Sequence, residues 1–520
     1  MMTMNTWLKA ATVGAALTAS ATAMAGNDLR WGMTGDAISL DPQGVLGAVE
    51  VIFLRNVYDG LMVLDGDNQP IYGLAKSHEV LADGTLRFNL REGVKFHGGE
   101  DFTADDVVFS ITRTQGEKSA FKSMVAAVDK AVKVDDYTVD ITMKRPDPLI
   151  LNNLANTFIM DSGWAAEHGV EEAPGGSNKG WHTENNMNGT GMLQLVDRQP
   201  TISSTFTRNQ NFWGDAAGHY PSNIDKLITT TIGSASTRVA TLLSGDLDLV
   251  TEVPLPDLGR VDSDSNLKID GTAQLRTIFF GFNLTTDELA STDGNPFADK
   301  EVRKAVSVAL DRGLIKKKIM RGVSVPTTIL AYPGTQGHTA DLAAVEKGNP
   351  KKAKEMLAAA GYPDGFSVQL DCPNNRYVND ESICQAAVSM LAKAGIKVNL
   401  NALPKDQWMP LLLEDKSDFY MLGFGTPTND SLFTFGHIYN QGPFQSGYAN
   451  TEVTALIGEA AVEADAAKRT VIMEKISQIT KDDMAVVPVH YQMINWGMTN
   501  GLSIPVDFGN MPNFRYAVMQ

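Results

Sequence analysis

The sequence predicts a globular, multidomain protein of the α/β class, and three observations support this expectation. An apolar strand pattern over residues 366–370 is followed by a helical pattern over 381–394 and by strand-like alternation at Ile396, Val398 and Leu400. A strand, a helix and a second strand in this order form a βαβ unit. The 520 residues suffice for about three domain-sized units. The composition, 43% hydrophobic and 20% charged, is ordinary for a globular protein and argues against bulk disorder.

Residues 1–25 have the pattern of a cleavable signal peptide. Lys9 supplies the positive charge, Ala10–Ala21 is small and apolar, and Ala23–Ala25 fits a cleavage site after Ala25. The stretch is too short to span a bilayer, and no Cys follows it that could carry a lipid anchor. We therefore expect an exported, soluble protein of the periplasm, without stable membrane insertion.

The charge and the missing motifs exclude several classes of function. The net charge of −17 disfavours nucleic acid and anionic lipid as partners. The sequence contains no G-x-S-x-G or H-E-x-x-H motif, and no Lys-Ser or Lys-Thr follows Gly189-Thr190-Gly191 as a phosphate loop would require. The eight His are scattered without metal-ligand spacing. The sequence thus predicts no catalytic residue, no cofactor and no metal.

The stretch from Arg87 to Arg113 is the most informative part of the chain. Residues 87–90 alternate like a half-buried strand, and Gly98-Gly99 permits a turn. Thr103 stands at a helix N-cap position, with acidic residues in the first turn and a buried face formed by Val107, Val108 and Ile111. A strand, a turn and a capped helix are common, so this pattern alone indicates no function.

The order of the residues in this stretch resembles a known family motif. FHGGEDFTADDVVFS resembles the signature of the extracytoplasmic solute-binding proteins of family 5, the oligopeptide-, dipeptide- and nickel-binding components of ABC importers. Further segments resemble other family motifs: Ser39–Pro42, Gly189–Gly191, Asn209–Gly214, Ser236–Asp248 and the segment that begins at Pro296. The resemblance implies a two-lobed, type II periplasmic binding protein with an extra domain inserted in the first lobe.

The resemblance also suggests domain boundaries. Lobe 1 would comprise residues 26–60, 189–280 and 492–520, the inserted domain 61–188, and lobe 2 residues 281–491. Lobe 2 shows clear helix signals, with Asp299 and Asn349 as caps and a core stripe at Val302, Ala305, Val306, Ala309 and Leu310. An apolar strand at Val486–Val489 would be the return crossing, and Pro488 argues for an edge position.

Cys372 and Cys384 are the only cysteines. In an oxidising compartment they could form one disulfide, and two buried thiols are the alternative. The resemblance favours the disulfide, because similar family members carry it.

Three groups of residues are candidate ligand contacts. Arg376 and Tyr377 lie between a strand end and a helix start, where open α/β sheets bind ligands, and Arg376 offers a fork of donors for a carboxylate. The alternative for Arg376 is a surface pair with Asp380. The glycine-rich segment 423–430 contains Phe424 and Asp430. By resemblance to dipeptide binders, Asp430 would hold a ligand ammonium; the alternative is a helix N-cap.

Aromatic and amide side chains complete the candidate set. Trp408 is favoured because it stands in a polar context, where a buried Trp is less expected, and Tyr491 is a further candidate. Tyr58 could face the ligand or belong to the core, and Asn283 could meet a ligand or cap a turn.

These observations predict a monomeric, non-enzymatic substrate-binding protein of an ABC importer. It would capture a small peptide or peptide-like zwitterionic solute between its lobes and deliver it to the permease subunits. The alternatives are a binding protein for an opine, an oligosaccharide or a chelated metal, and, from another class, an exported hydrolase.

Overall fold

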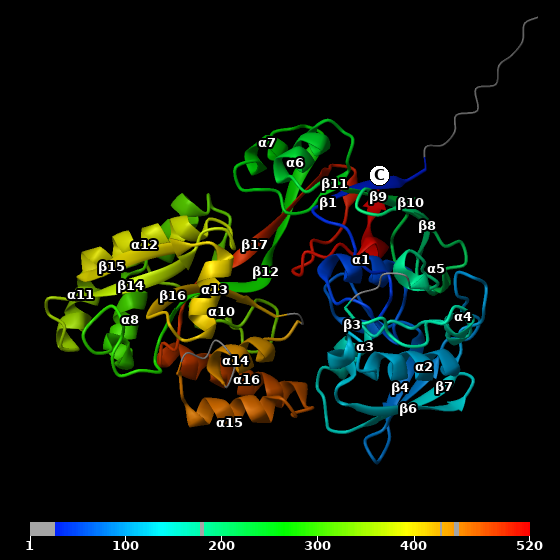
Figure 1. The fold of residues 1–520 in the computed structure, drawn as a ribbon, viewed down its shortest axis with the longest axis horizontal. Coiled ribbons are helices and arrows are strands. Elements are labelled where there is room, and N and C mark those ends of the chain that lie inside the picture. Colours follow the sequence, from blue (N-terminus) through cyan, green and yellow to red (C-terminus); the bar gives the residue numbers. More distant parts are fainter. Residues whose placement is uncertain (1–25, 177–180, 427–428, 441–446) are drawn as a thin grey trace, which may run out of the picture.

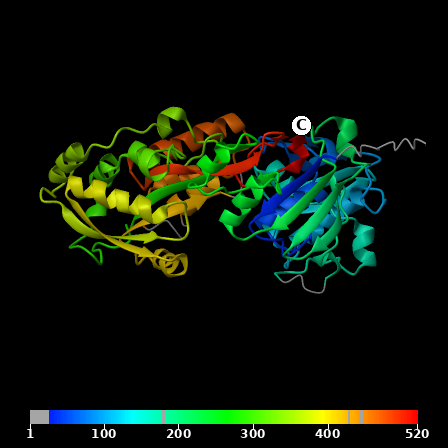
Figure 2. The same ribbon diagram turned by 90° about the horizontal axis from the view of Figure 1, so that it is seen from above.

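The computed structural model describes residues 26–176, 181–426, 429–440 and 447–520. The signal peptide predicted over residues 1–25 lies outside the described residues. The chain forms two lobes, joined by the long antiparallel strands β12 (Leu267–Phe282) and β17 (Val487–Thr499), as Figures 1 and 2 show. The fold is thus the two-lobed α/β fold that the sequence predicts.

One sheet continues through both lobes by way of these two strands. Its strand order is β15-β14-β16-β12-β17-β11-β1-β10-β9-β8, and β13 also pairs with β17. The first lobe contributes β1 (Asp28–Met33), β8 (Leu193–Gln199), β9 (Ser203–Arg208), β10 (Lys226–Thr231) and β11 (Leu249–Val250). The second lobe contributes β13 (Val325–Pro326), β14 (Phe366–Pro373), β15 (Ile396–Leu403) and β16 (Phe419–Gly425).

Helices and short strands accompany the sheet in the first lobe. The lobe also contains α1 (Ala48–Val57), α5 (Trp213–Ala217), α6 (Ala235–Leu243), α7 (Leu258–Asp262), β18 (Leu502–Ser503), η5 (Phe514–Tyr516) and β19 (Val518–Met519). Its core gathers Trp31, Phe53 and Phe206 from the sheet and from α1.

The inserted domain has a sheet of its own, with the strand order β4-β5-β7-β6. Its elements are β2 (Met62–Leu64), β3 (Pro70–Tyr72), β4 (Ala75–Val80), β5 (Leu86–Leu90), α2 (Ala104–Gln115), η1 (Lys122–Val125), β6 (Val128–Asp135), β7 (Thr138–Met143), α3 (Ile150–Leu154), α4 (Ser162–Glu167) and η2 (His182–Glu184). Thr103 caps α2 as predicted: its side chain accepts from the Asp105 amide, and Asp106 completes a capping box. Phe88 and Ile111 lie in a separate core.

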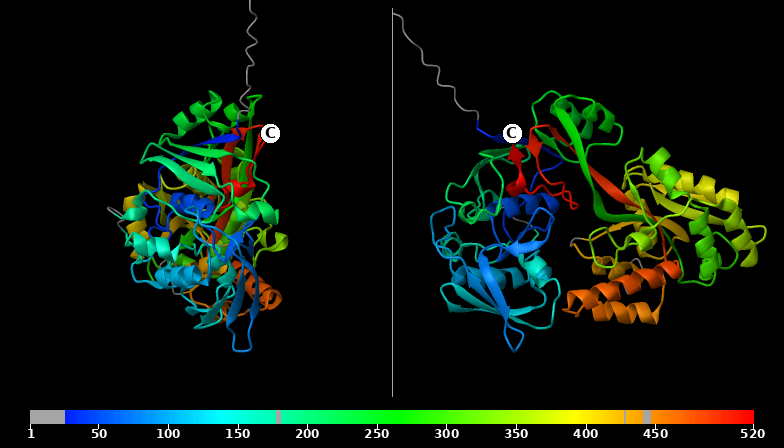
Figure 3. Two further views of the ribbon diagram at one scale, coloured as in Figure 1. Left: turned by 90° about the vertical axis from the view of Figure 1, so that its right-hand side faces the viewer. Right: turned by 180° about the vertical axis from the view of Figure 1, so that it is seen from behind.

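The second lobe surrounds its strands with helices (Figure 3). They are η3 (Pro296–Ala298), α8 (Lys300–Ala309), α9 (Arg312–Leu314), the π-helix η4 (Ile315–Ile319), α10 (Ala340–Ala343), α11 (Pro350–Ala359), α12 (Asp380–Ala394), α13 (Lys405–Leu413), α14 (Leu432–Tyr439), α15 (Thr451–Ala460) and α16 (Ala466–Asp482). Asp299 and Asn349 cap α8 and α11 as predicted, and the α8 stripe is buried. Within the described ranges, no helix combines the length and apolar character that a bilayer crossing requires.

The edge position predicted from Pro488 fits the residue itself but not β17 as a whole, because on the side away from β12 the ladder partners of β17 face residues 490–491 and 497–498. β17 is an inner strand that pairs with β12 on one side and with β11 and β13 on the other. Pro488 is tolerated there because the register of β12 and β17 shifts between Ile278 and Phe279, which pair with His490 and Pro488. Proline, which lacks an amide hydrogen, is compatible with such an irregularity as well as with an edge.

A fully buried ion pair ties the inserted domain to the first lobe. Arg113 of α2 contacts Asp41 at 2.6 Å between Nη2 and Oδ2, and it also donates to Gln43 and to the carbonyls of Val170 and Glu172. Asp41 receives a further hydrogen bond from Thr183 at 3.0 Å. The Ser39–Pro42 segment therefore anchors the helix that follows the Arg87–Leu90 strand.

Arg113→Met should lower the free energy of unfolding by about 3–5 kcal/mol, because it leaves the Asp41 carboxylate buried without its partner. Lys118→Met is the matched control. It removes a solvent-exposed pair with Glu172 and should cost only about 0–1 kcal/mol. Chemical denaturation of the two variants measures the difference, and equal losses would contradict the anchoring role.

His490 on β17 gives the fold a pH dependence. Burial lowers the pKa of His490 from 6.5 to about 4, and neither ring nitrogen has a hydrogen-bond partner in the described structure. Because the folded pKa lies below the unfolded one, protonation favours unfolding. The contribution of neutral His490 to the free energy of unfolding is complete above about pH 6.5 and is lost as the pH falls towards 4.

Between pH 6.5 and 4, the unfolding free energy of the wild type should therefore fall more steeply than that of His490→Leu. The expected difference is about 1.4 kcal/mol per pH unit. Denaturant titrations at several pH values measure both slopes, and parallel slopes would show that folding does not shift the pKa of His490.

Candidate functional site

A cavity of about 620 Å³ lies between the lobes and is lined by residues from both. The first lobe contributes residues of α1, the β2–β3 turn and a loop near the C-terminus. The second contributes the loop after β14, the end of β16 and the start of α14. The crossing strand β12 contributes Gln274, Leu275 and Arg276. A cavity of this size suits a small solute.

A bulge in β12 places these three residues in the cavity. Ala273 pairs with Met493 and Thr277 pairs with Tyr491, so residues 274–276 stand opposite Gln492 alone. A β-bulge bends the strand and redirects its side chains. On one side of the bulge β12 pairs with the part of β17 that reaches the first lobe, and on the other it pairs with β16 of the second. The site is therefore built at the junction of the lobes.

Most of the cavity wall is apolar. Val51 of α1 and Phe508 of the C-terminal loop face it from the first lobe, and Leu422, Phe424 and Phe433 from the second. Phe424 stacks on Phe433 with a centroid distance of 6.1 Å. Aromatic surfaces of this kind accept the apolar body of a ligand at a low cost in side-chain entropy.

Three arginines and one aspartate are the charged residues of the wall: Arg55, Arg276, Arg376 and Asp507. Burial lowers the pKa of Arg55, the negative charge of Asp507 acts against this effect, and the positive charge of Arg515 adds to it. Burial is also the main cause that lowers the pKa of Arg276, followed by the positive charge of Arg376. The cavity thus holds guanidinium groups in surroundings that hydrate them poorly.

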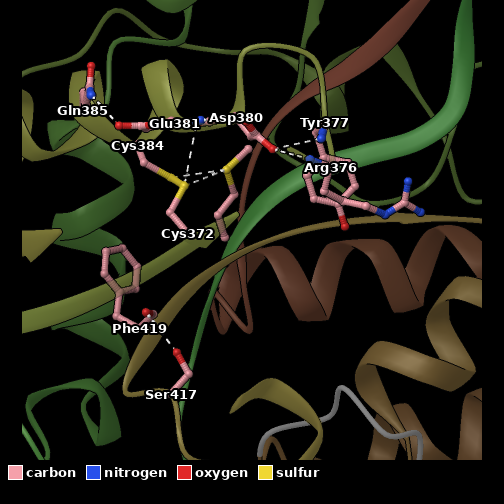
Figure 4. Close-up of a disulfide and its surroundings, with 10 residues drawn as sticks. Cys372, Arg376, Tyr377, Asp380, Glu381, Cys384, Gln385, Ser417 and Phe419 are labelled. Atoms are coloured by element: carbon pink, nitrogen blue, oxygen red, sulfur yellow. Dashed lines mark hydrogen bonds between the residues drawn. A yellow bond between two sulfur atoms is a disulfide. The ribbon is translucent and has the colours of Figure 1, made fainter. Parts of the chain in front are cut away.

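The loop that carries Arg376 is fixed by a disulfide and a carboxylate. Cys372, near the end of β14, is bonded to Cys384 of α12, so the predicted disulfide is confirmed. Asp380 accepts hydrogen bonds from the amides of Arg376 and Tyr377 at 2.8 and 2.9 Å. Figure 4 shows that the Arg376 side chain points away from this network. Asp380 therefore orders the backbone and leaves the guanidinium exposed.

Tyr377 is a structural support with one face on the cavity. Its hydroxyl donates to the Gly423 carbonyl at 2.9 Å, and its ring meets Trp408 edge-on. The Arg376 guanidinium lies 5.2 Å from the ring centre, within cation–π range. The ring thus links β16 to the Arg376 loop.

The profile of "Bacterial extracellular solute-binding proteins, family 5 Middle" matches residues 69–446. The chain belongs to this family. Heme-binding protein A of Haemophilus influenzae is 27% identical over 456 residues, which cover 81% of this chain and 78% of that protein. The glutathione-binding protein GsiB of Pectobacterium atrosepticum is 27% identical over 412 residues, covering 77% and 74%.

A solved structure, HbpA2 from Haemophilus parasuis, has the same fold as this family 5 protein. The TM-score is 0.82 at 22% identity, with 95% of this chain and all of that one covered. The family and the two relatives above are binding proteins by description.

Three of the residues predicted for the site of this family 5 protein line the cavity: Arg376, Tyr377 and Phe424. The other five do not. Trp408 is 0% exposed and lies behind Tyr377 in the lobe 2 core, so its polar sequence context did not indicate exposure. Tyr58 is buried, and its hydroxyl accepts from the Asn188 amide at 3.2 Å.

Asn283, Tyr491 and Asp430 are occupied by internal bonds. Asn283 caps a turn by accepting from Thr285 and donates to the Asp415 carbonyl. The Tyr491 hydroxyl donates to the Ala331 carbonyl. Asp430 is buried against Arg469 at 2.5 Å and also accepts from the Leu432 amide at the start of α14. The alternatives weighed for Asn283 and Asp430, a cap in each case, match these contacts.

Arg55 and Arg276 are cavity residues that the sequence analysis did not identify. The available signal was a single Arg within a mainly apolar run, Val51–Val57 for Arg55 and Leu275–Phe280 for Arg276. A charged residue in such a run requires a partner or a function. The partner could not be identified without the bulge and the facing lobe.

Asp430→Asn should destabilise the protein without weakening ligand binding. The amide keeps the cap to Leu432 but leaves Arg469 buried without its countercharge, so the free energy of unfolding should fall by about 3–5 kcal/mol. Denaturation and calorimetric titration of the same variant measure the two effects. A loss of affinity with unchanged stability would instead show that Asp430 contacts the ligand.

Proposed function

We propose that this protein captures a small peptide-like solute in the interlobe cavity and delivers it to the permease of an ABC importer. The observation that carries the proposal is that one cavity is lined by both lobes and by the strand that joins them. A ligand that contacts both lobes stabilises the closed arrangement over the open one. The mechanism needs no covalent step.

The hinge strands give this closure a physical route. Leu275 and Arg276 belong to the bulge of β12 and line the cavity, so a bound solute contacts the connection itself. Irregular strand positions absorb changes of φ and ψ more readily than regular ladders do. Binding and lobe movement are thereby coupled at the same residues.

The residues of the cavity wall support this class of solute, and the ligands named for the relatives are consistent with it. An apolar surface with guanidinium groups suits a peptide-like molecule that offers carboxylates. Relatives are described as binding glutathione and heme, and each of these ligands carries carboxylates on a larger body. For a zwitterionic solute, the ammonium would lack the pairing with Asp430 that the sequence suggested, because Arg469 occupies that carboxylate.

Export to the periplasm and a monomeric state complete the proposal. The pattern of residues 1–25 supports cleavage after Ala25, and the family is described as extracellular. We also propose that the boundaries of the lobes and of the inserted domain lie at residues 60, 188, 280 and 491.

A thermal-shift screen of the mature protein against di- and tripeptides, reduced and oxidised glutathione, heme, opines and oligosaccharides tests the proposal. A peptide-like solute should raise the melting temperature by mass action. Arg376→Ala should weaken binding of that solute by about tenfold or more, because the exposed guanidinium is lost while the loop contacts of Asp380 remain.

The same incubations should return the solute chemically unchanged by mass spectrometry. Turnover would indicate an exported hydrolase. A melting temperature raised by an oligosaccharide alone would assign a different ligand class.

A further inference from the structure

The cavity differs sharply in charge from the rest of the protein. The chain as a whole carries a net charge of −17, yet the cavity wall holds three arginines and one aspartate. Arg55 comes from the first lobe, Arg276 from the β12 bulge and Arg376 from the second lobe. An acidic protein thus concentrates positive charge at the place where its lobes face each other.

The only acidic residue of the wall is already engaged. Asp507 is buried, and it accepts hydrogen bonds from Asn68 at 2.8 Å and from the amides of Gly509 and Met511 at 3.1 Å. It therefore orders the C-terminal loop. The segments outside the described residues contain no Asp or Glu, so they add no carboxylate.

The acidic residues near the cavity have other contacts or line another cavity. Asp430 is paired with Arg469, and Glu50 accepts from the Ile38 amide. Glu252 lines a smaller adjoining cavity of about 310 Å³, which shares Gln274 and Arg276 with the main one. The charge of Glu252 is the weakest of the influences on Arg276. The main cavity therefore offers a cation no free carboxylate among its described lining residues.

Two of the arginines have donors without partners. Nε and Nη1 of Arg55, which is 7% exposed, are buried and have no hydrogen-bond partner in the described structure. Nε of Arg276 is likewise buried and unpartnered, and its Nη1 makes only a 3.3 Å bond to Gln274. Leaving guanidinium donors unpaired beside apolar side chains costs free energy, and a bound anion would remove that cost.

We propose that the solute is anionic, with at least two carboxylates on an apolar body, one held by Arg55 and another by Arg276 and Arg376. This inference rests on the proposed function and specifies its solute. The two anionic groups would join the lobes, since their partners lie on opposite sides of the cavity. A free α-ammonium would contribute little, because no wall carboxylate is available to receive it.

Three tripeptides of similar size test the charge requirement by calorimetric titration. Acetyl-Glu-Leu-Glu carries carboxylates at both ends and no ammonium, Glu-Leu-Glu adds the ammonium, and acetyl-Gln-Leu-Gln amide is neutral. The first should bind at least about tenfold more tightly than the third, because the neutral peptide leaves the arginines unpaired. It should bind no more weakly than the second.

Matched Arg→Met variants test the residues, because Met keeps much of the side-chain length without the charge. Arg55→Met and Arg376→Met should each weaken acetyl-Glu-Leu-Glu by at least about tenfold. Arg260→Met is the control, since Arg260 is exposed on α7 beside Asp257, and it should leave the affinity unchanged. Arg376 is exposed, so its variant tests the inference even if the Arg55 variant folds poorly.

The outcomes separate this inference from the proposed function. If the neutral peptide binds as tightly as the anionic one, or if acetylation abolishes binding, the protein still captures peptides but the anionic specificity is overturned. If none of the peptides binds and no solute of the thermal-shift screen does, the proposed function itself fails, and the inference fails with it.

Discussion

The antiparallel pairing of β12 with β17 is the constraint on which the architecture depends. These two strands are the part of the main sheet that belongs to both lobes, so the lobes share a backbone ladder instead of being linked only by loops. Ladder hydrogen bonds fix the register, and the bulge at residues 274–276 locally relaxes it. The cavity is located at this relaxed point, which is why three consecutive residues of one strand serve both as connection and as wall.

Buried ion pairs explain how a strongly acidic chain presents a basic cavity. Asp41 is paired with Arg113, Asp59 with Arg515 and Asp430 with Arg469, each at 2.5–2.6 Å and almost without solvent exposure. These aspartates stabilise connections within the lobes and are unavailable to a solute. In the cavity, by contrast, donors of Arg55 and Arg276 have no hydrogen-bond partner in the described structure.

Much of the fold could be predicted from patterns among residues that are close in the sequence. The caps at Thr103, Asp299 and Asn349 and the strand that begins at Phe366 depend on near neighbours in the sequence, and the structure has them as expected. The site was only partly predictable because its residues meet over long sequence separations. Asp430 looks like a ligand contact until Arg469 is brought to it, and Trp408 looks exposed until Tyr377 covers it.

The Cys372–Cys384 bond gives the site a dependence on cellular compartment. It ties the segment that bears Arg376 to the first turns of α12, and it can persist only where thiols are oxidised. A copy of this chain retained in a reducing cytosol would keep both thiols and a looser Arg376 segment. Material prepared by export should therefore recognise its solute better than material prepared inside the cell, even though the two share one sequence.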